Sequence, residues 1–190
     1  MDPQLRHDRE ICKVSVSCFN NSATSGISSD ERERQLRLIL ESDVQPQMQP
    51  PTPSRLGKNV TVEAPFRCDY GYSLNIRDHV VIEVGCVVMD AVEVEIREGA
   101  HIGADVRIAS KVVPQDPRAR VDRPGRQIRK AKGIGVVIEE SVYIGDGDFI
   151  APELDTKDDV DGGLLRIGMN SCILPRTVVH KVSVCGTWRQ

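Results

Sequence analysis

IREGAHIGADVRIA, residues 96–109, places an isoleucine at every sixth position, at Ile96, Ile102 and Ile108. Neither an α-helix nor an ordinary amphipathic strand repeats its apolar positions with this period. A period of six is typical of the hexapeptide repeat, in which each hexad forms a short strand and a turn along one side of a triangular coil. Three hexads close a coil of about eighteen residues, with the aliphatic side chains directed toward its axis.

The same spacing recurs in three further groups along the chain. Their members are Ile76, Ile82 and Val88, then Ile138, Ile144 and Ile150, then Ile167, Ile173 and Val179. The fourth residue after each aliphatic is usually small or valine, which lets the corner of the coil close. One coil cannot bury its own interior, so several coils must stack to form a core. The pattern therefore predicts an all-β fold, a parallel β-helix of hexapeptide repeats.

The chain before the repeats has a different character. SSDERERQLRLIL, from Ser28, begins with the serine and acidic residues that favour a helix start, and Leu36, Ile39 and Leu40 share one helical face. QPQMQPPTPS, which follows, predicts an extended proline-rich segment. We therefore expect a short N-terminal helical cap over 1–44, a linker over 45–58, and a hexapeptide-repeat domain over 59–190 with loop insertions near 109–135 and 154–163.

Composition narrows the classes of partner. The formal net charge is −3 and no basic run is long enough to follow a nucleic-acid backbone, so no nucleic acid is expected. No apolar run reaches membrane-spanning length and the first residues lack a signal-peptide core, so we expect a cytoplasmic protein without membrane contact. No metal site is expected from the spacing of the six cysteines, which we interpret as small buried apolar residues: Cys12, Cys18, Cys68, Cys86, Cys172 and Cys185.

Several segments carry a resemblance to a known family. They are APFRCDYGYSLNI (64–76), GCVVMDAVEVEI (85–96), PQDP (114–117), SVYIGDG (141–147) and TVVHKV (177–182). In their order and spacing they resemble the maltose and galactoside O-acetyltransferases, a family of hexapeptide-repeat acyltransferases. The CFN triplet at 18–20 and the predicted helix after it resemble a shortened form of that family's N-terminal helical domain.

The resemblance implies a left-handed parallel β-helix, a homotrimer with active sites between subunits, acetyl-CoA as co-substrate, and a sugar or other hydroxyl-bearing small molecule as acceptor. Transfer of acetyl from a thioester to an alcohol needs a base, and histidine suits this role near pH 7. In the family this histidine immediately precedes the proline of the long loop, where the present sequence has Val113 before Pro114. Because valine accepts no proton, the family's usual base is missing.

Three acidic residues are candidates for the missing catalytic group. Glu83 matches an acceptor-pocket position of the family, and a buried carboxylate there with a raised pKa would act as a base. Asp90 matches the family's acidic pocket residue. Asp116 lies in the long loop, although an Asp between prolines also commonly holds a turn.

The resemblance also assigns residues to each substrate. For the acceptor pocket they are Asp69, Tyr70 and Val113. For acetyl-CoA they are Tyr143, Gly145, Asp146, Pro175, His180 and Lys181, although the family's closing stretch is reduced here to CGTWRQ. We interpret His79, in a predicted turn, and His101, next to an inward isoleucine, as surface histidines.

The sequence leaves three functions open. The first is a CoA-dependent O-acetyltransferase-like protein in which the base has moved. The second is an inter-subunit pocket adapted to a non-acyl-transfer reaction, such as an isomerisation or a cyclisation. The third is a non-catalytic trimeric binding protein. The fold does not choose among them, because function depends on the site that a fold carries.

Overall fold

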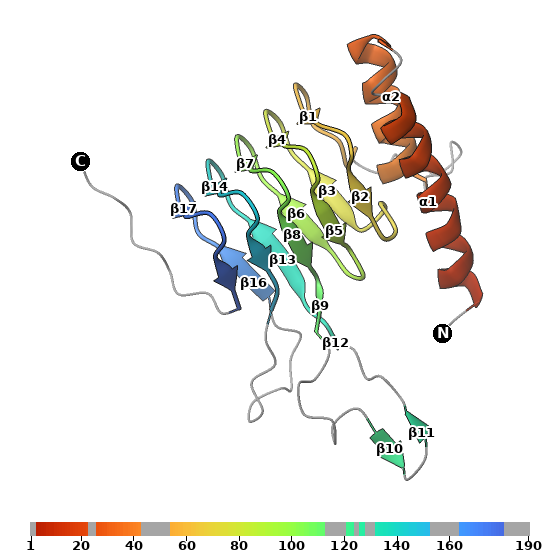
Figure 1. Ribbon diagram of the computed structural model, residues 1–190, viewed down its shortest axis with the longest axis vertical. Coiled ribbons are helices and arrows are strands. Elements are labelled where there is room, and N and C mark those ends of the chain that lie inside the picture. Colours follow the sequence, from red (N-terminus) through yellow and green to blue (C-terminus); the bar gives the residue numbers. More distant parts are fainter. Residues whose placement is uncertain are drawn as a thin grey trace.

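The computed structural model describes residues 3–22, 26–42, 54–112, 121–123, 126–127, 132–152 and 164–180. Within these ranges, two helices stand at one end of a stack of short parallel strands (Figure 1). Much of the predicted linker and of the two predicted insertions falls outside the described residues. The domain boundaries therefore stay predictions.

The two helices, α1 (Pro3–Ser22) and α2 (Ser29–Leu40), pack against each other beside the first strands. The Ser28 hydroxyl accepts a hydrogen bond from the Glu31 backbone N–H at 3.3 Å, so Ser28 caps α2. Neither of these helices has the length and apolar character that a membrane crossing requires. The predicted helix and its apolar face are confirmed by the burial of three side chains: Leu36, Ile39 and Leu40.

Three parallel sheets form the three faces of the coil stack. Sheet 1 contains β1 (Thr61–Val62), β4 (Val81–Ile82), β7 (His101–Ile102), β14 (Tyr143–Ile144) and β17 (Cys172–Ile173). Sheet 2 contains β2 (Arg67–Cys68), β5 (Val87–Met89), β8 (Arg107–Ala109), β15 (Phe149–Ile150) and β18 (Val178–Val179). Sheet 3 contains β3 (Leu74–Ile76), β6 (Val94–Ile96), β13 (Gly135–Ile138) and β16 (Leu164–Ile167). The chain visits the sheets in the order 1, 2, 3, so each round forms one coil.

Two short antiparallel pairs extend from this stack at the longer predicted insertion. In one pair β9 (Lys111–Val112) lies against β12 (Lys132–Gly133). In the other β10 (Val121–Arg123) lies against β11 (Arg126–Gln127). The insertion leaves after sheet 2 and the chain returns to begin sheet 3, so it does not disturb the stacking of the coils.

The core consists of the predicted hexad aliphatics stacked in register. In sheet 1 Ile82 pairs with Ile102, Ile102 with Ile144, and Ile144 with Ile173. Every member of the four predicted groups is buried except Ile173 and Val179, which belong to the last described coil and are partly exposed. The hexad rows and the parallel β-helix predicted from the sequence are thereby confirmed.

The coils turn at residues with positive φ. At the corner between sheets 3 and 1 these residues are Asn59, His79, Gly99, Ser141 and Asn170. At the corner between sheets 1 and 2 they are Gly85, Asp105, Gly147 and Arg176. Each precedes the fourth residue after a hexad aliphatic, which is small or valine at all of these corners except at Asp148. The sequence did not reveal this conformation, because His, Ser and Arg adopt it here beside the Asn, Asp and Gly that normally favour it.

The interpretation of all cysteines as buried apolar residues was wrong for two of them. Cys12, Cys68 and Cys86 are buried, whereas Cys18 and Cys172 are exposed. Cys172 begins β17 and alternates with Ile173, so its side chain points away from the axis. Cys18 lies on α1 outside that helix's buried positions. Cys185 lies outside the described residues.

Candidate functional site

The first group of predicted site residues meets at the corner between sheets 1 and 2, hereafter the Glu83 corner. Val81, His101 and Tyr143 pair side by side in sheet 1. Glu83 follows β4, and its Oε1 lies 2.6 Å from Nε2 of His101 on the neighbouring strand. The Tyr143 ring packs against the imidazole of His101 at a centroid distance of 5.3 Å and an interplanar angle of 57°.

The structure differs from one expectation about this corner and extends another. Glu83 was expected to be a buried carboxylate, yet its side chain is 36% exposed, because the chain turns there and the carboxylate lies on the outer face. His101 does point outward, with 39% of its side chain exposed, but it is paired with Glu83 and is more than an isolated surface histidine. Sequence reasoning missed the pair because it depends on the register between two coils.

Three predicted CoA-binding residues also lie at the Glu83 corner. A Cβ on Gly145 would stand 2.5 Å from the backbone N of Pro175, so the two coils approach closely there. Oδ1 of Asp146 accepts a hydrogen bond from the Ala104 backbone N–H at 3.1 Å, which ties its turn to the preceding coil. The backbone thus brings Gly145, Asp146 and Pro175 together beside Tyr143.

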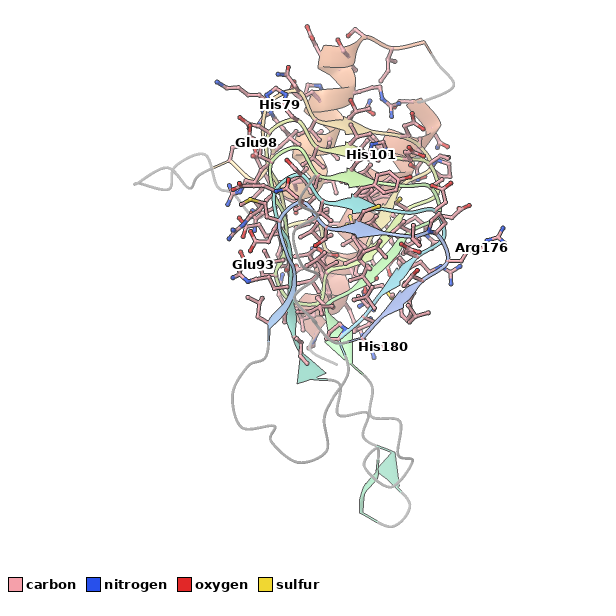
Figure 2. The ribbon with its side chains drawn as sticks, turned by 90° about the vertical axis from the view of Figure 1, so that its left-hand side faces the viewer. His79, Glu93, Glu98, His101, Arg176 and His180 are labelled. Carbon is pink, nitrogen blue, oxygen red and sulfur yellow. The ribbon has the colours of Figure 1, made fainter. Side chains whose placement is uncertain are left out.

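The remaining predicted site residues are placed elsewhere. Nδ1 of His180 lies 3.3 Å from the carbonyl oxygen of Ala151 at the end of sheet 2. Figure 2 shows His180 well apart from His101, so the structure does not join it to the Glu83 corner. Val113, Asp116 and Lys181 lie outside the described residues, and their predicted roles stay predictions.

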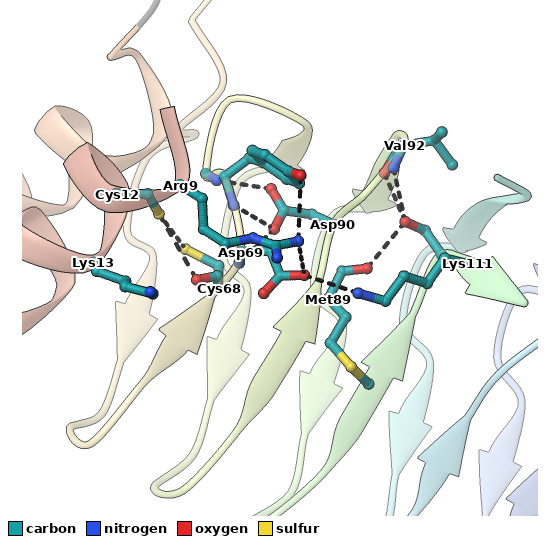
Figure 3. A network of polar contacts seen from close by, with 12 residues as sticks. Arg9, Cys12, Lys13, Cys68, Asp69, Met89, Asp90, Val92 and Lys111 are labelled. Carbon is teal, nitrogen blue, oxygen red and sulfur yellow. Dashed lines mark hydrogen bonds and ion pairs between the residues drawn. The ribbon is translucent and has the colours of Figure 1, made fainter. Parts of the chain in front are cut away.

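A second group surrounds Asp69 and Tyr70, at the corner that follows β2 (Figure 3). The Arg9 guanidinium of α1 donates to Asp69 Oδ2 at 3.1 Å and to the Tyr70 hydroxyl at 3.2 Å. Nζ of Lys111 lies 3.2 Å from the same Asp69 oxygen. The structure therefore brings together two of the three predicted acceptor-pocket residues, Asp69 and Tyr70, with Arg9 and Lys111. Sequence reasoning missed Arg9 and Lys111 because neither belongs to a recognised segment.

Asp90 holds the backbone of this second group. Its side chain is fully buried, and its carboxylate accepts backbone N–H hydrogen bonds from Asp69 at 2.8 Å, Tyr70 at 3.0 Å and Gly71 at 2.7 Å. Burial raises the pKa of Asp90, and the three backbone N–H groups oppose that rise. In this chain Asp90 acts on the pocket through Asp69 and Tyr70, since no part of it reaches solvent.

Helix α1 forms one wall of a groove of about 640 Å³ beside these residues. The side chains that line it include Arg9, Lys13, Arg67, Arg107 and Asp69. Asn20 fixes the helix against β2, because its amide accepts from the Phe66 backbone N–H and donates to the Phe66 carbonyl, both at 2.9 Å. Among the described residues, no cluster of three His, Cys, Asp or Glu side chains is arranged to hold a metal ion.

Comparisons with known proteins place this geometry in context. No family model matches the chain. Nodulation protein L of Rhizobium leguminosarum bv. viciae is 33% identical over 151 residues, which are 80% of this chain and 68% of that protein. Its counterpart in Rhizobium meliloti is 34% identical over 97 residues, and the chain spans about half of that relative's length (50%).

Solved structures show the same fold. A hexapeptide-repeat acetyltransferase of Vibrio cholerae superposes with a TM-score of 0.57 at 18% identity, covering 93% of this chain and 87% of that chain. A galactoside acetyltransferase in complex with coenzyme A gives 0.53 at 19% identity, covering 94% and 78%. A maltose O-acetyltransferase of Clostridium difficile gives 0.52 at 25% identity, covering 93% and 83%. The chain is therefore a left-handed parallel β-helix and belongs to the hexapeptide-repeat acetyltransferase family of nodulation protein L and the maltose and galactoside O-acetyltransferases.

Proposed function

We propose that this protein is a CoA-dependent O-acetyltransferase that transfers acetyl from acetyl-CoA to a hydroxyl group of a sugar or similar small molecule. Family membership supports the acetyl transfer. A galactoside acetyltransferase with the same fold binds coenzyme A, which supports the choice of donor. The observation that carries the proposal is the arrangement of the Glu83 corner.

At this corner, the predicted position for the acetyl acceptor and the predicted positions for acetyl-CoA lie along one line. Glu83, Gly103 and Gly145 follow neighbouring strands of sheet 1, and each donates its backbone N–H to the next coil. Because neighbouring strands are about 4.8 Å apart, Gly145 lies about 10 Å from Glu83 along the stack. CoA bound beside Gly145 and Pro175 would extend its acetyl end about 10 Å along the stack to meet an acceptor held at Glu83.

The Asp69 group lies at a different corner of the stack. Asp69 follows β2 of sheet 2, whereas Glu83 follows β4 of sheet 1. One coil stack therefore presents the two halves of the acceptor pocket in different directions. A homotrimer in which the Glu83 corner of one subunit faces the Asp69 corner of the next would complete the site, and we include this assembly in the proposal. The cytoplasmic location expected from the sequence stays a prediction.

Calorimetry and a turnover assay test the proposed function. We expect acetyl-CoA to bind, and the thioester absorbance to fall faster when a sugar such as galactose, maltose or glucosamine is added. Thiol reagents are avoided as the readout, because the exposed Cys18 and Cys172 would react with them. A folded protein that shows no heat of binding with acetyl-CoA would contradict the proposal, and would favour a different reaction or a pure binding protein.

A further inference from the structure

We infer that His101, oriented by Glu83, is the general base that replaces the family's missing histidine. The inference rests on the proposed function and deepens it by naming the group that takes the hydroxyl proton. The family's histidine position carries Val113, which accepts no proton. The Glu83 corner, by contrast, holds an imidazole next to an acceptor-pocket position.

The contact between the two side chains determines which ring nitrogen is available. An ionised carboxylate only accepts hydrogen bonds, so Nε2 of His101 carries the hydrogen and donates it to Glu83 Oε1 at 2.6 Å. Hydrogen bonds to a charged oxygen are short and strong, which favours this tautomer. Nδ1 of His101 makes no hydrogen bond with any residue in the described part of the chain. Nδ1 is therefore the nitrogen with a free lone pair.

The ring is held from both sides of its strand. Glu83 contacts it from the coil before, and the Tyr143 ring packs against it from the coil after, 5.3 Å between centroids. Aromatic pairs in tilted arrangements restrict each other's orientation. Since 39% of the His101 side chain remains exposed, the ring is fixed and still open to a ligand. A base needs this combination of fixed orientation and access.

Three carboxylates, that of Glu83 included, lie around the pair of His101 and Glu83. Carboxylates of Glu83, Asp105 and Asp146 lie at this corner, and all three oppose ionisation of the buried Cys86 thiol. Tyr143 and the exposed Cys172 are the titratable side chains that follow His101 in the same row of sheet 1. Fixed negative groups at this corner are suited to complement the positive charge that develops on a base in the transition state.

The step balances in atoms and electrons. The acceptor hydroxyl passes its proton to Nδ1 of His101 as its oxygen attacks the acetyl carbonyl carbon of acetyl-CoA, forming the C–O bond. The C–S bond then breaks, and the sulfur leaves with the electron pair as the CoA thiolate. The thiolate takes the proton back from Nδ1, so the products are the acetyl ester, free CoA and a neutral His101. Glu83 keeps its hydrogen bond to Nε2 throughout and acts as a positioning residue.

Kinetics of three variants test the inference. We expect His101→Gln to lower kcat by about 10²- to 10⁴-fold, the usual contribution of a positioned base, with the calorimetric Kd for acetyl-CoA unchanged. Glu83→Gln keeps a hydrogen-bond acceptor but loses the charge, so we expect a smaller loss of kcat. His79→Asn is the matched control, because His79 lies in a turn one coil earlier, and Asn suits its positive φ. We expect this control to keep wild-type rates.

The pH profile of the rate and the tautomer of the His101 ring distinguish a catalytic role of His101 from a purely structural one. We expect kcat/KM of the wild type to fall toward acid pH, because the base must be neutral to take a proton, and we expect this fall to be absent in His101→Gln. In ¹⁵N-histidine NMR of the wild type, we expect the His101 ring to carry its hydrogen on Nε2. A wild type that turns over acetyl-CoA while His101→Gln keeps its rate and acid limb would overturn the inference and leave the proposed function standing. A wild type that neither binds nor turns over acetyl-CoA would remove the proposed function itself.

Discussion

At the scale of single residues, Asp90 shows how a buried charge organises a surface site. Its carboxylate has no contact with solvent and receives three backbone N–H groups from residues 69–71. Leaving those donors unpaired would cost about 1–3 kcal/mol each. The turn, and with it Asp69 and Tyr70, therefore depends on Asp90. A residue that resembles an acceptor contact in sequence thus acts here by holding the turn that presents Asp69 to the groove.

Cys86 provides a pH-dependent prediction at the same scale. Burial, with Asp105, Glu83 and Asp146 nearby, raises the pKa of its thiol from 9.0 to about 11. Between pH 9 and pH 11, the Cys86 thiol loses its proton in the unfolded chain and keeps it in the folded chain. The contribution to stability is thus complete below pH 9 and is lost as the pH rises toward 11. We expect wild type to lose about 1–2 kcal/mol more than Cys86→Ala across this interval.

Urea unfolding at a series of pH values from neutral to strongly alkaline measures this difference. Cys86→Ala keeps a small apolar side chain at the position, so the comparison isolates the ionisation of this thiol from that of the other buried cysteines, Cys12 and Cys68. Stability curves of wild type and variant that stay parallel through the alkaline range would show that Cys86 ionises normally in the folded protein.

At the scale of elements, the corners decide how closely the coils stack. Gly145 and Gly168 both follow an aliphatic of the hexad pattern, Ile144 and Ile167. Their surroundings differ, because Gly145 faces the backbone of Pro175, whereas the nearest atom to a Cβ on Gly168 is the Ser171 hydroxyl at 3.8 Å. The same place in the repeat therefore carries a steric requirement in one coil and none in another.

The two glycines form a matched pair of variants. Gly145→Ala places a Cβ 2.5 Å from the Pro175 backbone N, so two coils must separate, and we expect a loss of about 1–3 kcal/mol. Gly168→Ala meets ordinary van der Waals space and should change the stability by less than about 0.5 kcal/mol. Urea midpoints of both variants measure the difference. Equal midpoints would mean that the close approach of Gly145 to Pro175 does not limit stacking.

At the scale of the whole molecule, the three-sided stack separates the candidate site into two halves. The Glu83 corner ends strands of sheet 1, and the Asp69 group ends a strand of sheet 2. Helix α1 adds Arg9 to the second half only. In the assembly proposed above, a catalytic unit would draw the two halves from neighbouring copies of the chain.

The separation of the two halves leads to a prediction about the mass of the protein in solution. One chain has a mass of 21.0 kDa, so a homotrimer has three times that value, about 63 kDa. Light scattering coupled to size-exclusion chromatography should give the trimer mass, and dilution that yields monomers should reduce turnover in parallel. Full activity in a 21.0 kDa species would mean that one chain contains a complete site.

The sequence by itself determined the repeat and the core of this protein. The hexad aliphatics such as Ile82, Ile102 and Ile144 stack as their spacing predicts, because a local period fixes which side chains point to the axis. The helix from Ser28 was equally visible, since its cap and apolar face lie within one short segment. The close positions of Gly145, Asp146 and Pro175 also follow from repeat spacing, once adjacent coils are known to stack.

The tertiary structure alone decided which surface side chains meet. The contact of His101 with Glu83 depends on the length of the coil between them, and the ion pair of Arg9 with Asp69 depends on how α1 docks against the first coil. Sequence spacing does not specify either contact. The chain between Glu83 and His101 includes the irregular step of eight residues from Val88 to Ile96, and a linker without a repeat separates Arg9 from Asp69. The local repeat thus determines the core of the coil stack, while the packing of segments far apart in the chain determines the candidate site.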